Sequence, residues 1–222
     1  MSIRKTSFVQ GEYYHIYNRG NSKQKIFHDK FDYIRFINLL YISNTKENFN
    51  LFDLNRVSNF NIYETDRKNN LVSIGAYCLM PNHFHILITQ TEEKGISKFM
   101  QKLTTAYSMY YNKKYERTGG LFEGKFKSEH ANNDRYLKYL FSYIHLNPIK
   151  LIQKDWKEKG IKDKKKSIEY LNGYQYSSFI DYLGINRIQN KILNQKSFPN
   201  YFSTKGKFIK EIFEWLSALG KT

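Results

Sequence analysis

Two histidines separated by one residue, His83 and His85, are the best candidates for chemistry in this sequence. They follow Met80-Pro81-Asn82, which separates two apolar runs at residues 72–79 and 84–89. Proline cannot donate to a sheet ladder and Pro-Asn favours a turn, so we expect two strands joined by a tight connection. Residues two apart share one face of a strand, so both imidazoles point the same way. Such a pair forms half of a metal site, although paired histidines on a half-exposed strand also serve structural roles.

A second group of polar side chains lies on a helix predicted over residues 135–146, capped by Asn133 or Asp134 and stopped by Asn147-Pro148. Tyr143 and Asn147 are four residues apart, so they share one face of this helix. Asn147 stands at the helix end, where its amide is free to turn toward a ligand. If that face meets the histidine pair, the site contains two imidazoles, one amide oxygen and one phenol.

The elements that must position these residues follow a recognisable order. Hydrophobic periodicity and turn residues predict strands at 13–19, 72–79, 84–89 and 128–130, a short strand near 61–63, and helices at 31–41, 95–115 and 135–146. This order predicts an α+β fold with a ferredoxin-like antiparallel sheet. In the first strand we interpret His15 as a packed or hydrogen-bonded core residue, whereas Arg19, beside Gly20, is placed to meet a phosphate.

Residues 149–222 form a basic helical extension in this interpretation, continuous with a core of residues 1–148. Residues 148–222 carry fifteen basic and seven acidic side chains, a net charge of +8. Helices are predicted at 174–183 and 208–219, and the charged run 162–166 is either a solvated loop or a contact to phosphates.

Composition limits the class of partner. The chain has 222 residues and a net charge of +16, which favours nucleic acid over an acidic membrane surface. Lysine-rich codon usage is an alternative source of part of this charge. The single cysteine, Cys78, excludes an internal disulfide framework and is expected to be a small buried hydrophobe. No apolar run is long enough for a membrane span and no secretory signal is recognised, so we expect a cytoplasmic protein.

Four ordered motifs resemble REP-associated tyrosine transposases, a branch of the single-tyrosine HUH transposases in the IS200-like superfamily. The motifs are Tyr14-His15-Ile16-Tyr17-Asn18-Arg19-Gly20, Met80-Pro81-Asn82-His83-Phe84-His85, Gly120-Leu121-Phe122-Glu123-Gly124-Lys125-Phe126-Lys127-Ser128 and Tyr143-Ile144-His145-Leu146-Asn147-Pro148. The resemblance covers roughly residues 12–184, and residues 185–222 match no motif of the family. It implies an HUH endonuclease core.

The resemblance also implies roles for individual residues. His83 and His85 align with the metal-binding pair, Asn147 with the third ligand, and Tyr143 with the nucleophile that forms a covalent phosphotyrosine. Tyr136 and Tyr139 are rival nucleophiles that lack an asparagine four residues on. The implied cofactor is Mg²⁺ or Mn²⁺, and the implied partner is single-stranded DNA that bears a palindromic-repeat hairpin.

Four basic residues are the candidate phosphate contacts, each with ordinary solvated surface as its alternative: Arg19, Lys125, Lys127 and Arg135. Two other functions compete with the transposase. One is a non-mobile protein that binds repeat hairpins without cleaving them. The other is an HUH relaxase or replication-type nicking enzyme, which the chain length and the late tyrosine disfavour. Monomer and homodimer both remain open.

Overall fold

Four strands form one antiparallel sheet in the order β2-β3-β1-β4. A computed structural model describes residues 7–47, 62–67 and 69–219, with side chains as far as residue 214. The strands are β1 (Tyr13–Arg19), β2 (Val72–Met80), β3 (His83–Gln90) and β4 (Lys127–His130). Helices α1 (Lys30–Ile42) and α3 (Gly95–Lys114) connect them in a β-α-β-β-α-β order. The predicted ferredoxin-like α+β fold is therefore confirmed.

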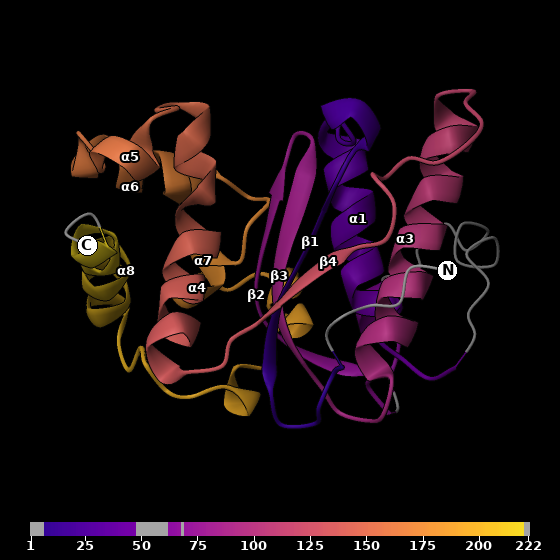
Figure 1. The fold of residues 1–222 in the computed structure, drawn as a ribbon, viewed down its shortest axis with the longest axis horizontal. Coiled ribbons are helices and arrows are strands. Elements are labelled where there is room, and N and C mark those ends of the chain that lie inside the picture. Colours follow the sequence, from indigo (N-terminus) through magenta and orange to yellow (C-terminus); the bar gives the residue numbers. More distant parts are fainter. Residues whose placement is uncertain (1–6, 48–61, 68, 220–222) are drawn as a thin grey trace.

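Helices α1 and α3 cover one face of the sheet (Figure 1). Asp29 caps α1 by accepting hydrogen bonds from the backbone amides of Phe31 and Asp32, which starts the helix at the residue after the cap. Phe36 of α1 packs edge-on against Tyr107 of α3, with ring centroids 4.9 Å apart. Such aromatic pairs, buried between helices and sheet, form the main hydrophobic core.

Helix α4 (Asp134–Leu146) covers the opposite face of the sheet (Figure 1). The side chain of Asn133 caps it by accepting from the amide of Tyr136, 2.8 Å away. Its apolar stripe packs on β2 and β3 through Leu137, Leu140, Phe141 and Ile144. Because both faces of the sheet are covered, every residue of β2 is buried, including Cys78 as predicted.

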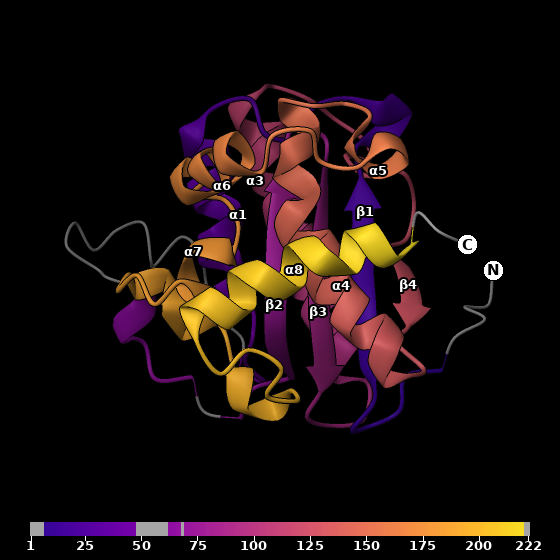
Figure 2. The same cartoon turned by 90° about the vertical axis from the view of Figure 1, so that its left-hand side faces the viewer.

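The remaining elements lie beside α4, along the β2 edge of the sheet or, for η4, beside α1. They are the 3₁₀ turn η3 (Asn147–Leu151), α5 (Trp156–Lys159), α6 (Lys164–Gly173), α7 (Phe179–Tyr182), the turns η4 (Ile188–Ile192) and η5 (Gln195–Ser197), and α8 (Lys205–Leu219). Helix α8 crosses α4 on its outer side (Figure 2). Further short turns are η1 (Asn21–Lys23) and η2 (Ile62–Glu64).

The segment before α7 extends the sheet at β2. The amide of Leu79 donates to Tyr176 O and the amide of Ser178 donates to Tyr77 O, each at 2.9 Å. The register of β2 shifts between Ile74 and Ala76, so Gly75 sits in a bulge. A side chain at Gly75 would meet the ring of Phe198 at 2.8 Å, which explains the glycine. The chain thereby covers an edge strand that would otherwise expose unpaired backbone groups.

Three local predictions were wrong. The expected strand near 61–63 is instead the turn η2 where it is described, because Tyr63 is buried against Tyr41; Asn61 lies outside the described residues. The charged run 162–166 is exposed, but its last three residues open helix α6 and do not form a loop; Asp163 caps this helix by accepting from the amide of Lys166. The helix expected over 174–183 is restricted to α7, because residues 176–178 pair with β2. Among the described residues, no helix combines the length and apolarity needed to cross a membrane.

Candidate active site on the sheet

The histidine pair stands at the start of β3, directly after the Pro81-Asn82 turn. The rings of His83 and His85 lie with their centroids 5.0 Å apart, on the face of the sheet that α4 covers. Phe84 points the other way and packs against Phe36, with ring centroids 5.0 Å apart. The strand alternation predicted from the sequence therefore holds.

The end of α4 brings Tyr143 and Asn147 to these histidines. The half-buried ring of Tyr143 lies 5.3 Å from the ring of His85, centroid to centroid. Asn147 opens η3 and is 2% exposed. Its amide lies beside both His83 and Tyr143, where the contact tends to raise the pKa of His83 and to lower the pKa of Tyr143. The four residues that the sequence predicted to meet thus lie together in one chain.

The polar atoms of this group fit a cation. His83 Nδ1 lies 2.6 Å from Asn82 Oδ1, an acceptor, which fixes the proton on that nitrogen and leaves Nε2 with its lone pair. His85 Nε2 and Asn147 Oδ1 are buried and have no hydrogen-bond partner. Buried polar atoms are seldom left unpaired, so these two acceptors suit a ligand that supplies positive charge. No group of three His, Cys, Asp or Glu side chains able to hold a metal occurs in the described part of the chain, so the amide of Asn147 would have to complete the site.

Burial controls the protonation of the group. Burial, with Lys150 and other cations nearby, lowers the pKa of His83 to about 4, and contact with Asn147 opposes the shift. Burial and the neighbouring His15 and His83 lower the pKa of His85 well below its usual value. Both imidazoles are therefore neutral near pH 7, as metal ligands must be. Burial also raises the pKa of the Tyr143 phenol, which contact with Asn147 partly offsets, so the phenol keeps its proton until something stabilises the phenolate.

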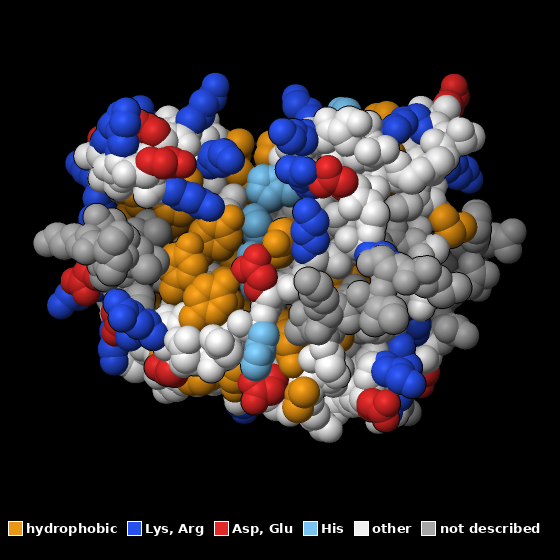
Figure 3. Space-filling model, in the orientation of Figure 1, with side chains coloured by type: hydrophobic (Ala, Val, Ile, Leu, Met, Phe, Trp, Pro, Cys, Tyr) orange, Lys and Arg blue, Asp and Glu red, His pale blue; other side chains and the backbone are white. Residues whose placement is uncertain are grey.

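A basic hollow opens next to His83. It has a volume of about 420 Å³ and is lined by Tyr17, Asn18, Arg19, Lys23, Asn82, His83, Lys127 and Lys150. Figure 3 shows a notch at the top of this face, where histidine side chains are visible between lysine and arginine side chains. Four of the eight lining residues are cationic, so the hollow is suited to bind a polyanion. Because His83 also lines the hollow, a polyanion bound there would lie next to the histidine pair.

The predicted phosphate contacts are distributed unevenly. Lys127 lines the basic hollow, as does Arg19, which also donates from Nη2 to Glu123 Oε1 at 2.9 Å. Lys125 is exposed on the loop before β4. Arg135 lies in the first turn of α4, about 18 Å along the helix from Asn147 at 1.5 Å per residue. The structure therefore brings two of the four to the site and leaves Arg135 at the far end of α4.

Sequence reasoning missed several residues beside the site. His15 is a buried, hydrogen-bonded residue as predicted, but its partner was not foreseen, since His15 Nε2 lies 2.9 Å from His85 Nδ1. Lys157 of α5 places Nζ 4.0 Å from the centroid of the Tyr143 ring. Lys150 lines the basic hollow. No short-range pattern marks these contacts, since they join residues that are far apart in sequence or lie on separate elements.

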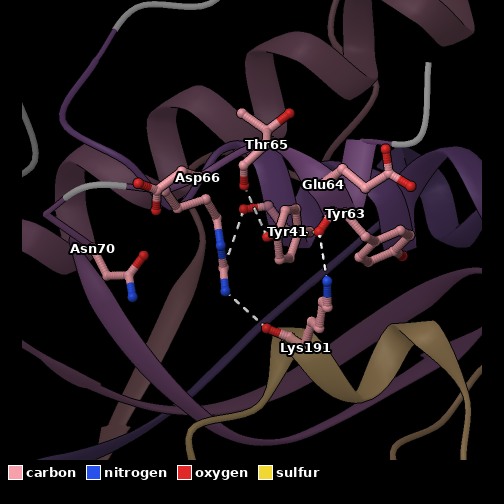
Figure 4. A pocket seen from close by; sticks show the side chains of 8 residues that line it. Tyr41, Tyr63, Glu64, Thr65, Asp66, Asn70 and Lys191 are labelled. Carbon is pink, nitrogen blue, oxygen red and sulfur yellow. Dashed lines mark hydrogen bonds between the residues drawn. The ribbon is translucent and has the colours of Figure 1, made fainter.

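A second hollow lies between α1, η2 and η4 and has a volume of about 440 Å³ (Figure 4). Its main cation, Arg67, stacks over the ring of Tyr41 at 3.7 Å and donates from Nη2 to Lys191 O at 2.7 Å. Lys191 Nζ in turn donates to Tyr63 O at 3.0 Å. Both cations donate to backbone carbonyls, so their hydrogen bonds connect the segment around η2 to η4.

The antiparallel sheet and the His-Phe-His pair at the start of β3 are the features that the resemblance to HUH transposases predicted. Residues 56–147 match the family model described as "Transposase IS200 like", and this segment contains His83, His85, Tyr143 and Asn147. The family resemblance drawn from the motifs is thereby confirmed for this segment.

The fold of the chain also resembles that of a solved structure. The chain is similar to one described as "Structure of the REP associates tyrosine transposase bound to a REP hairpin", with 12% sequence identity and a TM-score of 0.52. The similarity covers 85% of this chain and 90% of that chain, and at this identity it establishes a shared fold. No match was found among curated proteins.

Proposed function

We propose that this protein is a metal-dependent endonuclease and strand transferase that acts on single-stranded DNA through Tyr143. The observation that carries the proposal is the position of a tyrosine from the second half of the chain beside the histidine pair. The ring centroid of Tyr143 lies 5.3 Å from that of His85. The matched IS200-like transposase family and the fold shared with a REP-associated tyrosine transposase support the same chemistry.

In the proposed reaction the Tyr143 oxygen attacks a backbone phosphorus. A phosphorus–oxygen bond to the phenol forms while the bond to the 3′ oxygen breaks, and the phenol proton is lost as the leaving 3′ oxygen gains one. Because the phosphodiester is exchanged rather than hydrolysed, a second hydroxyl can later reverse the step and join a new strand without a nucleotide cofactor.

His83, His85 and Asn147 are the residues we propose to hold Mg²⁺ or Mn²⁺. When bound, the ion would polarise a non-bridging phosphate oxygen and offset the developing charge. The three side chains are neutral, so they would leave the full charge of the ion available to the substrate. Burial and the hydrogen bond from His83 to Asn82 hold the ligands in orientation before any ion arrives.

The proposed substrate is a DNA strand with a palindromic-repeat hairpin, and the proposed place of action is the cytoplasm. The related solved protein was bound to a REP hairpin, and the net charge of +16 here favours a polyanion. Lys127 and Arg19 would track phosphates through the basic hollow, while Lys125 and Arg135 would contact DNA farther from the cleaved bond. Since Tyr143 lies beside His85 of its own chain, we propose that it acts within one subunit.

We also propose that residues 149–222 work as a continuous extension of the catalytic core. This is supported by the pairing of residues 176–178 with β2 and by the contact between Lys157 and Tyr143.

The test is a Tyr143→Phe variant with a hairpin oligonucleotide and Mn²⁺. The variant should form no covalent protein–DNA adduct on a denaturing gel and should still bind DNA, because only the nucleophilic oxygen is removed. Tyr139→Phe, one helical turn earlier and stacked on Tyr143 at 5.8 Å, is the matched control and should keep adduct formation. Undiminished adduct in Tyr143→Phe would rule out the assigned nucleophile, and DNA binding with no adduct in the unaltered protein would favour a non-mobile hairpin-binding protein.

A further inference from the structure

His15 is the buried residue that the proposed mechanism leaves unused. It lies in the middle of β1, is 4% exposed, and places Nε2 2.9 Å from Nδ1 of His85. The two rings are nearly parallel, with centroids 5.0 Å apart. A buried imidazole in hydrogen-bond contact with a proposed metal ligand can determine how that ligand presents its other nitrogen.

The sheet register creates a line of three side chains. His15 is the direct cross-strand partner of Glu129 in β4. On its other side, His85 pairs with Tyr17, so His15 and His85 are diagonal neighbours on one face of the sheet. The line runs from the half-exposed Glu129 through the buried His15 to His85. It joins three strands and lies across the face that α4 covers.

The positions of protons along this line can be worked out from the contacts. His85 Nε2 is buried without a partner, and it can act as a ligand only if the proton of the neutral ring is on Nδ1. His85 Nδ1–H then donates to His15 Nε2, so the proton of His15 is on its own Nδ1. His15 Nδ1 has no hydrogen-bond partner and faces Glu129 Oε2 at 3.9 Å. The reverse tautomers would put the proton of His85 on Nε2 and block it.

Glu129 is held as the negative end of the line. Its Oε1 accepts from the Tyr17 hydroxyl at 2.9 Å and its Oε2 accepts from the Tyr136 hydroxyl at 2.8 Å. The nearby His15 lowers the pKa of Glu129 to about 2, an effect that burial opposes and the two tyrosine hydroxyls strengthen. The carboxylate is therefore charged near pH 7, where the imidazoles are neutral, and it favours a proton on the nitrogen of His15 that faces it.

We propose that Glu129 and His15 form a positioning relay that fixes the tautomer and ring orientation of His85, so that Nε2 is presented to a divalent cation. The proposal rests on the metal site proposed above and adds two residues outside the ligand set. Hydrogen-bond partners behind metal ligands typically contribute about 10- to 100-fold in metal affinity, so the relay should have a measurable effect.

The direct test is Mn²⁺ binding by calorimetry, without DNA, to the full chain and to Glu129→Gln, His15→Leu and His15→Gln. We expect about 10- to 100-fold weaker binding for His15→Leu, and partial recovery in His15→Gln, whose amide oxygen can accept from His85 Nδ1–H. Glu129→Gln should also weaken binding, and because Glu129 is half-exposed this variant should keep the fold. Glu12→Gln is the matched control, because Glu12 contacts the exposed His130 at 2.7 Å in a similar pair on the adjacent sheet position.

A second readout uses the metal-free protein. Nitrogen chemical shifts from NMR should show both His15 and His85 as the Nδ1–H tautomer in the unaltered chain, with a change at His85 in His15→Leu. Wild-type Mn²⁺ affinity in both Glu129→Gln and His15→Leu, or an Nε2–H tautomer at His85, would overturn the relay. If the unaltered chain and His83→Ala both fail to bind Mn²⁺, the proposed metal site itself is wrong, which is a different result.

Discussion

At the scale of single residues, a neighbouring side chain or burial leaves one acceptor atom of each proposed ligand free to bind a cation. Asn82 accepts from His83 Nδ1–H, the His15 contact occupies His85 Nδ1, and Asn147 Oδ1 is buried without a partner. His85 Nε2 and Asn147 Oδ1 are already desolvated, so a cation would meet ligands whose orientation is set before binding. Such preorganisation avoids ordering costs at the moment of binding.

Removing one ligand should therefore remove cleavage. For His83→Ala we expect a loss of at least about 100-fold in DNA cleavage at fixed Mg²⁺ or Mn²⁺, the upper end of what loss of a partner behind a ligand costs. A chelator should likewise abolish cleavage by the unaltered protein. Cleavage of a labelled oligonucleotide measures both. His130→Ala removes an exposed histidine and should retain activity, whereas full activity in the presence of chelator would contradict the metal site.

At the scale of elements, a buried carboxylate joins α1 to α3. Asp32 of α1 accepts from Lys114 Nζ and the Tyr115 hydroxyl, each at 2.7 Å, and from the Tyr110 hydroxyl at 3.0 Å. Its side chain is fully buried, so these hydrogen bonds replace the water that it lost. The two helices that support the back of the catalytic sheet therefore depend on an ionised Asp32.

This predicts a pH-dependent stability difference between the unaltered protein and Asp32→Asn. Burial alone would raise the pKa of Asp32, but hydrogen bonds from Lys114, His28 N and the tyrosines outweigh it and lower the pKa below its usual value. The unfolded chain thus binds the proton more readily, so this contribution is complete above the unfolded pKa of about 3.9 and is lost as the pH falls through the lower folded value. Asp32→Asn should lower the free energy of unfolding by roughly 1–3 kcal/mol near pH 7.

Denaturant unfolding at pH 7 and pH 3 measures the effect, and the difference between the two proteins should shrink at pH 3. Glu93→Gln, at a highly exposed carboxylate, is the control and should change stability little at either pH. A difference that is equal at both pH values would show that packing, and not the charge of Asp32, stabilises this contact.

At the scale of the whole molecule, the extension supplies part of the candidate active site. Helix α5 holds Lys157 over the face of the Tyr143 ring, with Nζ 4.0 Å from the centroid. A buried ion pair between Arg187 Nη2 and Asp181 further stabilises the extension, and the same guanidinium nitrogen donates to Tyr77 OH at 3.0 Å in β2. A cation over an aromatic face stabilises a phenolate more than a phenol, since the phenolate ring is richer in electrons.

Lys157→Met should therefore slow covalent adduct formation with saturating DNA by about 3- to 30-fold, the range given by a cation–π contribution of about 0.7–2 kcal/mol. Lys157→Arg should retain most of the rate because it keeps a cation over the ring. Single-turnover adduct formation against pH is the measurement, and the methionine variant should need a higher pH. Lys154→Met makes the same charge change at an exposed position nearby and should match the unaltered protein. Equal losses in both methionine variants would indicate general electrostatic attraction of DNA instead.

The sequence by itself determined the features that depend on local spacing. Alternation in β3 placed His83 and His85 on one face, and helical spacing in α4 aligned Tyr143 with Asn147. Apolar periodicity and turn residues also predicted the order of the elements, and hence the sheet. Local signals were misleading at η2 and before α7, where tertiary contacts of Tyr63 and β2 decided the backbone conformation.

Only the tertiary structure decided which distant residues meet. His15 and His85 are 70 positions apart, and their contact depends on the register between β1 and β3. Lys157 reaches Tyr143 because η3 and α5 turn back over the end of α4. Register and helix docking are determined by burial of the whole core, a property summed over many side chains, so no short segment of sequence specifies them.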